Sequence, residues 1–227
     1  MQLASQRRRA GTNPGAPSTR DRLKAAARSL FAERGIEGTT VRDILTVAGE
    51  KNGASLNYYF RSKDELIREL TVDVFRLMDD RWSARLAELD QRGGVRDIRD
   101  YVRILVISSD TSDIEEEPTT ARLSEAITHH RYHLVREILK EHKLNAYDQI
   151  LGRIADLMND MPRPILRQRL LLLTRYLSSV FALYEASRAS NAQPRSVQLP
   201  ASADFGNLID TAVGMLTAPV VDGNPEG

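Results

Sequence analysis

Residues 48–66, with the sequence AGEKNGASLNYYFRSKDEL, place three adjacent aromatic side chains between two polar turns. The first half of this stretch is polar and contains two glycines, which favour a turn. Residues 54–60 predict a short helix with Asn52 as its N-cap, because polar residues precede the apolar ones. Leu56 and Phe60 are four residues apart and are therefore expected on the inward face of that helix.

Three other helix starts surround this stretch. In each, a hydroxyl side chain is followed three residues later by an acidic one, the spacing of an N-cap or capping box. The pairs are Ser18 with Asp21, Thr40 with Asp43, and Ser62 with Glu65. Apolar residues at helical spacing follow each pair, so we expect a first helix ended by Gly35, a short second helix ended by Gly49, and a long fourth helix. Because a two-turn helix is unstable alone, these helices are expected to pack together.

The remainder of the chain also predicts helices, and it contains no convincing strand or internal repeat. Periodic apolar residues cover about 95–107, 121–161 (with a bend or break near Lys143), 163–190 and 205–216. The expected fold class is therefore all-α, with an N-terminal three-helix helix-turn-helix domain joined to a larger helical domain. The expected divisions are a disordered basic tail (1–17), the helix-turn-helix domain (18–66), the larger domain (67–217) and a flexible C-terminal tail (218–227).

Composition excludes several classes of protein. The chain of 227 residues contains no cysteine, which excludes disulfides, thiol catalysis and cysteine-ligated zinc. It has no run of apolar residues long enough to cross a membrane, and no apolar stretch follows the basic N-terminal run as in a secretory signal. We therefore expect a cytoplasmic protein without membrane association. A glycine-rich phosphate loop after a strand and a nucleophile elbow are both missing, so we expect neither an enzyme nor a bound cofactor.

Charge is distributed unevenly along the chain. Residues 1–66 carry 12 Lys and Arg against 7 Asp and Glu, whereas the remainder carries 20 against 24. A basic N-terminal quarter on a slightly acidic body predicts one region that faces a polyanion, although scatter could produce the same imbalance. The basic run Arg7–Arg9 either enters the minor groove of DNA as a flexible arm or is a solvated tail.

One long and two short helices, with glycines in the turn between the short ones, describe a helix-turn-helix motif whose second short helix lies in the major groove of DNA. Its polar residues are expected to contact bases, and cations and hydroxyl groups nearby are expected to contact phosphates. The candidate DNA-binding residues are Thr40, Lys51, Asn52, Ser55, Asn57, Tyr58, Tyr59 and Lys63. Of these, Lys51, Tyr59, Lys63 and Thr40 are the phosphate candidates. Alternatively, Tyr58 and Tyr59 complete the core of the domain.

Residues 38–67, GTTVRDILTVAGEKNGASLNYYFRSKDELI, resemble the N-terminal signature of the TetR (tetracycline-repressor-like) transcriptional regulators. The shared features are a capped, Thr-initiated helix, an Ala-Gly turn, a recognition helix ending in Tyr/His-x-Phe, and Ser-Lys-x-x-Leu; the resemblance covers residues 19–66. The sequence departs from the family pattern in two places. The turn before Phe60 is one residue longer than in the commonest pattern, which makes Lys51 and Asn52 hard to align, and Asn57 stands where many members have tyrosine.

The resemblance implies a function for the larger domain. It implies that residues 67–217 bind a small-molecule inducer and form a homodimer through the last two helices. The protein would repress transcription at a palindromic operator in double-stranded DNA, and inducer binding would release it. The sequence allows such an interface, because six apolar residues form a stripe that is either a dimer face or monomer core: Leu173, Tyr176, Leu177, Val180, Phe181 and Tyr184.

Aromatic residues of the larger domain are candidates for a ligand pocket, because aromatic walls with a few polar tips suit a mostly apolar ligand. The candidates are Trp82, Tyr101, Ile104, Tyr132, His133, Tyr147, Tyr176 and Tyr184. Ordinary core packing is the alternative for each of them. Arg163, Arg167 and Arg169 would meet the phosphates of an anionic ligand at the pocket mouth, or they form a solvated face.

Two other functions compete with the ligand-responsive regulator. Glu125, His129 and His133 lie at i, i+4 and i+8, where they would share one face of a continuous helix and could bind a metal ion. The set occurs once and lacks the Glu-x-x-His pairs of a di-iron bundle, so we predict no metal site. A ligand-independent architectural DNA-binding protein is disfavoured, because about 150 helical residues exceed what DNA binding alone requires.

Overall fold

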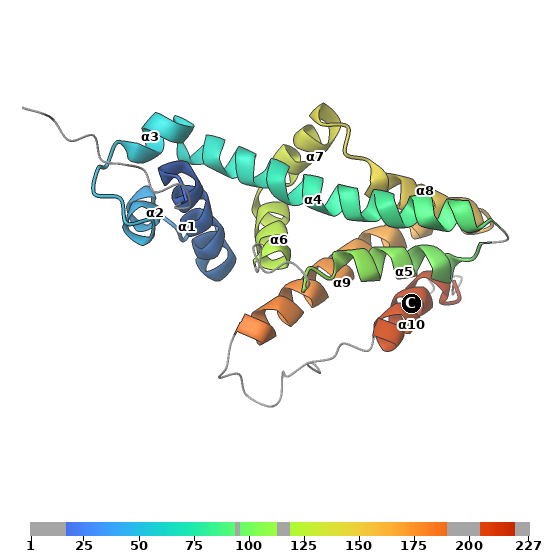
Figure 1. The fold of residues 1–227 in the computed structure, drawn as a ribbon. Helices are drawn as coiled ribbons and strands as arrows, with labels where there is room; N and C mark the ends of the chain where they lie inside the picture. Colours follow the sequence, from blue (N-terminus) through green and yellow to red (C-terminus); the bar gives the residue numbers. More distant parts are fainter. Residues whose placement is uncertain (1–16, 94–95, 113–118, 190–204, 221–227) are drawn as a thin grey trace, which may run out of the picture.

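The computed structural model describes residues 17–93, 96–112, 119–189 and 205–220. Within these ranges the chain forms ten helices and no strand, which confirms the all-α prediction (Figure 1). The helices are α1 (Thr19–Arg34), α2 (Val41–Val47), α3 (Ser55–Phe60), α4 (Lys63–Arg92), α5 (Ile98–Ser109), α6 (Thr120–His130), α7 (Tyr132–Glu141), α8 (Ala146–Leu157), α9 (Arg163–Ala189) and α10 (Phe205–Thr217). The predicted tails, including Arg7–Arg9, lie almost entirely outside the described residues.

The predicted caps begin three of the first four helices. At α2, the Thr40 hydroxyl accepts a hydrogen bond from the Asp43 N–H (3.2 Å), and the Asp43 carboxylate accepts one from the Thr40 N–H (2.9 Å). Ser18 and Asp21 form the same capping box at α1. At α4, the Ser62 hydroxyl accepts from the Glu65 N–H (3.1 Å), which is one half of the predicted box.

Two predicted boundaries are wrong. Asn52 is not the N-cap of α3, which begins at Ser55; its side chain instead accepts a hydrogen bond from the Ala54 N–H at 3.0 Å, and this local turn competes with helix. The predicted helix over 121–161 is three helices. It breaks near Lys143, as expected, and also at Arg131, where the backbone leaves the helical region at φ −133° and ψ 38°.

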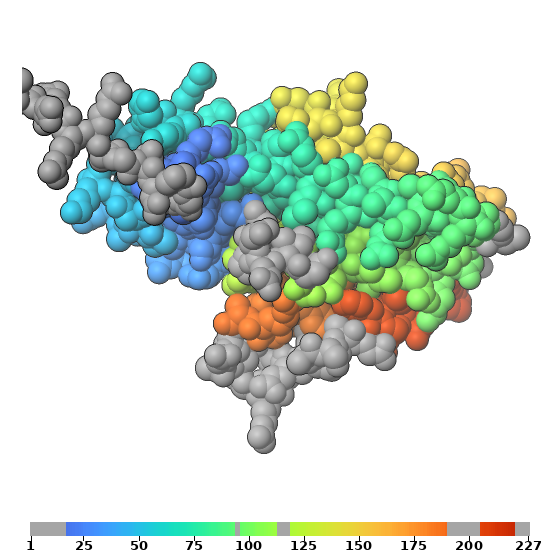
Figure 2. All heavy atoms as spheres, viewed as in Figure 1, coloured from blue at the N-terminus to red at the C-terminus, as the bar shows by residue number. Residues whose placement is uncertain are grey.

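Helix α4 connects the two ends of the molecule (Figure 1). Its N-terminal half packs with α1–α3 in one buried cluster, the head cluster, which contains Phe31, Ile44, Leu56 and Leu70 among other residues. Two body helices contribute to the same cluster, through Leu123 and Ile127 of α6 and Val135 of α7. Figure 2 shows the helix-turn-helix head as one end of the molecule. The predicted division at residue 66 stays a prediction.

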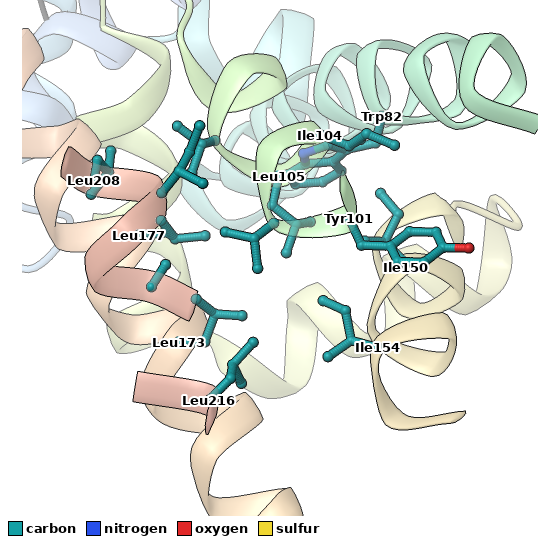
Figure 3. Packing of buried hydrophobic residues seen from close by; sticks show 14 of the residues in the cluster. Trp82, Tyr101, Ile104, Leu105, Ile150, Ile154, Leu173, Leu177, Leu208 and Leu216 are labelled. Carbon is teal, nitrogen blue, oxygen red and sulfur yellow. The ribbon is translucent and has the colours of Figure 1, made fainter. Parts of the chain in front are cut away.

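The C-terminal half of α4 belongs to a second cluster, the body cluster, with α5, α8, α9 and α10. Figure 3 shows side chains of these helices meeting around a common centre. Leu173, Leu177 and Phe181 are at most 5% exposed, so this part of the predicted dimer stripe is monomer core. Tyr176, Val180 and Tyr184 are partly buried and pack against the same cluster. No helix in the described ranges is both long enough and apolar enough to span a membrane.

The Asp43 cap predicts a pH dependence of stability. Hydrogen bonds from the Thr40 side chain and backbone lower the pKa of Asp43 in the folded protein. A lowered folded pKa contributes stability that is present above the unfolded pKa and lost as pH falls through the folded pKa. We therefore expect Asp43→Ala to lower the unfolding free energy at pH 7. The difference from wild type should shrink below about pH 3.9, the usual aspartate pKa.

The measurement is urea unfolding of wild type and Asp43→Ala at pH 7 and pH 3. Asp160→Ala removes an exposed aspartate that makes no hydrogen bond or ion pair with the described residues, and it serves as the control. A difference between wild type and Asp43→Ala that is the same at both pH values would contradict the role of the ionised carboxylate.

Candidate DNA interface and ligand cavity

Helix α3 has one buried face and one exposed face. Leu56 and Phe60 are 0% and 2% exposed, as predicted, and they fix α3 on the head cluster. Asn57, Tyr58 and Tyr59 point away from that cluster, and Tyr58 is 81% exposed. The alternative in which Tyr58 completes the core is therefore wrong. The rings of Tyr58 and Tyr59 pack edge to face, with centroids 4.9 Å apart, and form an aromatic rim beside Asn57.

Ser55 does not belong to the exposed face. It is 8% exposed, and its hydroxyl donates a hydrogen bond to Glu50 Oε2 at 3.3 Å. This burial contradicts the prediction that Ser55 contacts bases, because the hydroxyl is turned toward the loop before α3. Its role is to connect the first turn of α3 to the preceding loop.

Glu50 anchors the longer turn between α2 and α3. Its N–H donates to the Leu45 carbonyl oxygen (2.9 Å), and its carboxylate accepts from Arg22 of α1. Arg22 also donates to Thr19 Oγ1 (2.9 Å) and to the Ala48 carbonyl oxygen (3.4 Å). The hydrogen bond from Arg22 lowers the pKa of Glu50, so the carboxylate is charged at neutral pH. These contacts hold a turn with one additional residue in a defined conformation.

Lys63 lies at the junction of the first four helices. Its ammonium group donates to the carbonyl oxygens of Ile36 and Thr39, both at 2.6 Å, and lies 5.7 Å from the centroid of the Phe31 ring. A lysine ammonium has three N–H donors, and two of them close the turn between α1 and α2. Its contact with DNA phosphate stays a prediction, and the structure adds a positioning role that the sequence pattern did not indicate.

The remaining candidates are on the surface of the head. Lys51 and Asn52 are exposed in the turn, and the exposed Thr40 uses its hydroxyl in the α2 cap. Exposed residues that sequence reasoning missed are Arg42 on α2 and Arg61 directly after α3. Helical periodicity could have indicated Arg42, because it lies opposite the buried Ile44. Arg61 has a positive φ of 65°, which no sequence pattern indicated.

A cavity of about 300 Å³ opens in the body between α4, α6, α7, α8 and α9. Three predicted pocket residues line it, namely Trp82, Tyr132 and Tyr147. The other five do not. Tyr101 and Ile104 are core residues (Figure 3), His133 is exposed on α7, Tyr176 packs beside the body cluster, and Tyr184 lines a second, more polar cavity of about 340 Å³.

Two aromatic side chains form one wall of the first cavity. The ring centroids of Trp82 and Tyr147 are 4.8 Å apart, and the Tyr147 hydroxyl donates to Thr174 Oγ1 at 2.8 Å. Burial raises the pKa of Tyr147 to about 12, so its hydroxyl stays protonated at neutral pH. The buried Trp82 Nε1–H has no hydrogen-bond partner among the described residues.

Charged groups also line the first cavity. Arg136 of α7 and Asp148 of α8 form an ion pair at 3.3 Å. Arg175 of α9 is exposed and has no ion-pair or hydrogen-bond partner among the residues described. The predicted cations Arg163, Arg167 and Arg169 do not line the cavity. Arg169 donates instead to the Leu216 carbonyl oxygen at 2.6 Å and holds the end of α10.

The three residues of the metal-binding alternative do not lie on one helix. Helix α6 ends at His130 and α7 begins at Tyr132, so Glu125, His129 and His133 do not share a continuous helix. Glu125 accepts a hydrogen bond from the Ser179 hydroxyl at 2.6 Å. Among the described residues, no three His, Cys, Asp or Glu side chains are grouped as metal ligands.

Helix α6 contacts both the head and the body. Glu185 of α9 accepts hydrogen bonds from the Ala121 and Arg122 N–H groups (2.7 and 3.1 Å) and from Arg122 Nε (3.0 Å). Burial raises the pKa of Glu185, and these three donors oppose the shift. At the same end of α6, the buried Arg28 of α1 donates to Thr120 Oγ1 at 3.4 Å. The N-terminus of α6 therefore joins α1 to α9.

Known proteins match the head of this chain in sequence. Residues 23–70 match the family described as bacterial regulatory proteins, tetR family. The repressor KstR2 of Mycolicibacterium smegmatis, named an HTH-type transcriptional repressor, is 45% identical over 56 residues. KstR2 of Mycobacterium tuberculosis is 49% identical over 53 residues. These matches cover 25% and 23% of this chain, and 27% and 26% of the relatives, so the chain matches about a quarter of their length.

Solved structures resemble most of the chain. The fatty acid degradation regulator FadR from Bacillus halodurans has a TM-score of 0.56 at 17% identity, covering 92% of this chain and 98% of that chain. AmtR of Mycobacterium smegmatis has a TM-score of 0.54 at 18% identity, covering 96% and 92%. At this identity the resemblance shows the fold alone. With the sequence match over residues 23–70, it identifies the head as a helix-turn-helix domain of the tetR type, joined to a body that shares the fold of these solved structures.

Proposed function

We propose that the protein is a sequence-specific, DNA-binding transcriptional regulator rather than an enzyme. In this proposal it acts in the cytoplasm as a homodimeric repressor of a palindromic operator, and a small-molecule inducer releases it. The observation that carries the proposal is helix α3, whose buried Leu56 and Phe60 fix it on the head while Asn57, Tyr58 and Tyr59 remain exposed. The curated relatives that match this head are named transcriptional repressors.

In this proposal α3 lies in the major groove. Asn57 is then the base-contacting residue, because an asparagine amide can form two hydrogen bonds with adenine. Lys51, exposed in the turn before α3, contacts phosphate, which strengthens binding to any DNA sequence. Tyr59 contacts the DNA backbone with its hydroxyl. Glu50, Ser55 and Lys63 position these side chains without occupying the exposed face of α3.

Substitutions of Asn57 and Lys51 are expected to have different effects. Asn57→Ala should cost about 1–3 kcal/mol on the preferred sequence and reduce discrimination among sequences. Lys51→Ala should weaken binding to all sequences and lower the salt slope by about two in a dimer, one per subunit. The measurement is a salt titration of binding to the DNA upstream of the protein's own gene and to a scrambled duplex of equal length.

Lys140→Ala is the control for charge, because Lys140 is exposed on α7, outside the head. If Asn57→Ala and Lys51→Ala changed affinity and salt slope identically, the division into base and phosphate contacts would be wrong. Equal binding of wild type to both duplexes would count against a regulator of that upstream DNA.

A second copy of the chain is the proposed occupant of the outer face of α9. Leu172 and Leu183 are 51% and 38% exposed and lie eleven residues apart, about three helical turns, so they share a face. The buried Leu173 and Leu177 lie on a different side of α9. Helix α10 packs beside α9, so two copies related by a two-fold axis would form a four-helix interface. Such a dimer presents two copies of α3 to two half-sites about 34 Å apart.

Charged substitutions on this face should separate the dimer. The double variant Leu172→Glu, Leu183→Glu is expected to be a folded monomer, because four carboxylates would be buried without partners at the interface. Light scattering after size exclusion measures the mass. Leu157→Glu, on α8 and 46% exposed, is the control and should stay dimeric. A double variant with the wild-type mass would place the interface elsewhere.

The proposed inducer response passes through α6. Ser124 and Thr128 of α6 line the cavity, while Leu123 and Ile127 of the same helix belong to the head cluster. A ligand that moves α6 therefore changes how the head packs on the body, and with it the separation of the two heads in a dimer. The ligand shifts the equilibrium only as far as its affinities for the two states differ.

The connection through α6 is testable without a ligand. Glu185→Gln removes the charge that pairs with Arg122 and caps α6, and we expect a loss of about 1–3 kcal/mol of stability. Hydrogen exchange should increase both in the first turn of α6 and around Arg28 in α1. The control is Glu125→Gln, a substitution on α6 of a side chain that accepts a hydrogen bond from Ser179. It should leave hydrogen exchange unchanged in both regions. An increase confined to the start of α6 would show that this contact does not reach the head.

A further inference from the structure

We propose that the first cavity binds an apolar anion, with a hydrocarbon body inside and the negative charge at Arg175. This inference rests on the proposed ligand-binding function of the same cavity and specifies the chemistry of the ligand. It depends on two features of the cavity, which are its apolar wall and the distribution of charge around it.

The wall selects an apolar body. The cavity volume of about 300 Å³ is at the lower end of the range for small-molecule pockets. Its wall is largely hydrophobic and comes from three helices, with the apolar residues Met78, Trp82, Leu151, Leu170, Leu177 and Phe181. Burial of hydrocarbon against such a wall is favourable roughly in proportion to the apolar area removed from water.

The Trp82 side chain contributes its indole ring to that wall. Its indole N–H can only donate a hydrogen bond, and among the described residues nothing accepts from it. The Nε1 atom is closed off from solvent and from the space of the cavity, so a ligand atom does not reach it there. The contact that Trp82 offers a ligand is therefore the apolar surface of its ring.

The charges select an anion. Arg136 and Asp148 balance each other at 3.3 Å, which leaves Arg175 as the uncompensated charge among the described residues that line the cavity. Arg175 is exposed, whereas its neighbour Thr174 is hydrogen-bonded to the Tyr147 hydroxyl in the cavity wall. A ligand with its anionic group at Arg175 would therefore keep that group hydrated while its body is buried. The planar guanidinium group suits carboxylate and phosphate oxygens.

The protein contains one tryptophan, so Trp82 fluorescence reports directly on this cavity. We would titrate the full-length protein, without DNA, with decanoate, decyl phosphate and decanol, which share a ten-carbon chain. At least one anion is expected to bind about tenfold or more tightly than decanol. Comparison of the two anions distinguishes a carboxylate from a phosphate ligand.

Arg175→Gln should reduce the preference for the anion to less than about twofold, and Arg175→Lys should restore part of it. Arg167→Gln is the matched control, because Arg167 is exposed on the same helix and does not line the cavity. Circular dichroism of each variant confirms that it is folded.

Equal affinity for decanol and both anions would overturn the proposal. So would an unchanged preference in a folded Arg175→Gln variant, or the absence of a saturable Trp82 response to either anion. Because these titrations contain no DNA, they are independent of the operator measurements. An anion that binds in the cavity but leaves DNA binding unchanged would count against the proposed inducer response, and not against the chemistry of the cavity.

Discussion

The continuity of α4 is the constraint on which the rest of the structure depends. The helix extends without a break from Lys63 to Arg92, and its buried residues divide between the head cluster and the body cluster (Figure 1). Val74 packs with the head, and Met78, one turn later, packs with the body. The two clusters therefore share one continuous helix. Helix α6 adds a second connection between the same two parts.

The exposed face of α3 depends on packing beneath it. Two hydrophobic side chains hold the helix, and the contact between Glu50 and Arg22 holds the turn before it. Polar residues near the turn therefore fall into two groups. One group is exposed, and the other is hydrogen-bonded to residues of the head. Asn57 is in the first group, while Ser55 and Lys63 have partners within the head. Within residues 50–63, the side chains that hold α3 and its turn are thus different from the side chains that α3 leaves exposed.

The candidate site could be predicted from the sequence only in part. Local patterns identified the N-caps of α1, α2 and α4, the inward face of α3 and three cavity residues, because each depends on neighbours within one or two helical turns. They did not identify Arg136 or Arg175, since these lie on helices that meet only through tertiary packing. They also placed Tyr101 and Ile104 in a pocket, because periodicity shows that a residue is buried and not whether its neighbours leave a space.

The sequence by itself determined the all-helical class, the starts of α1, α2 and α4, and the family of the head. These follow from hydrogen bonds and apolar periodicity that act within a few residues. The tertiary structure decided the break at Arg131, the engagement of Glu50 and Lys63, and the location of the cavity. Each of these depends on contacts between residues far apart in the chain, such as Lys63 with Ile36, for which the local pattern carries no signal. Long-range packing therefore determined which candidates share a site.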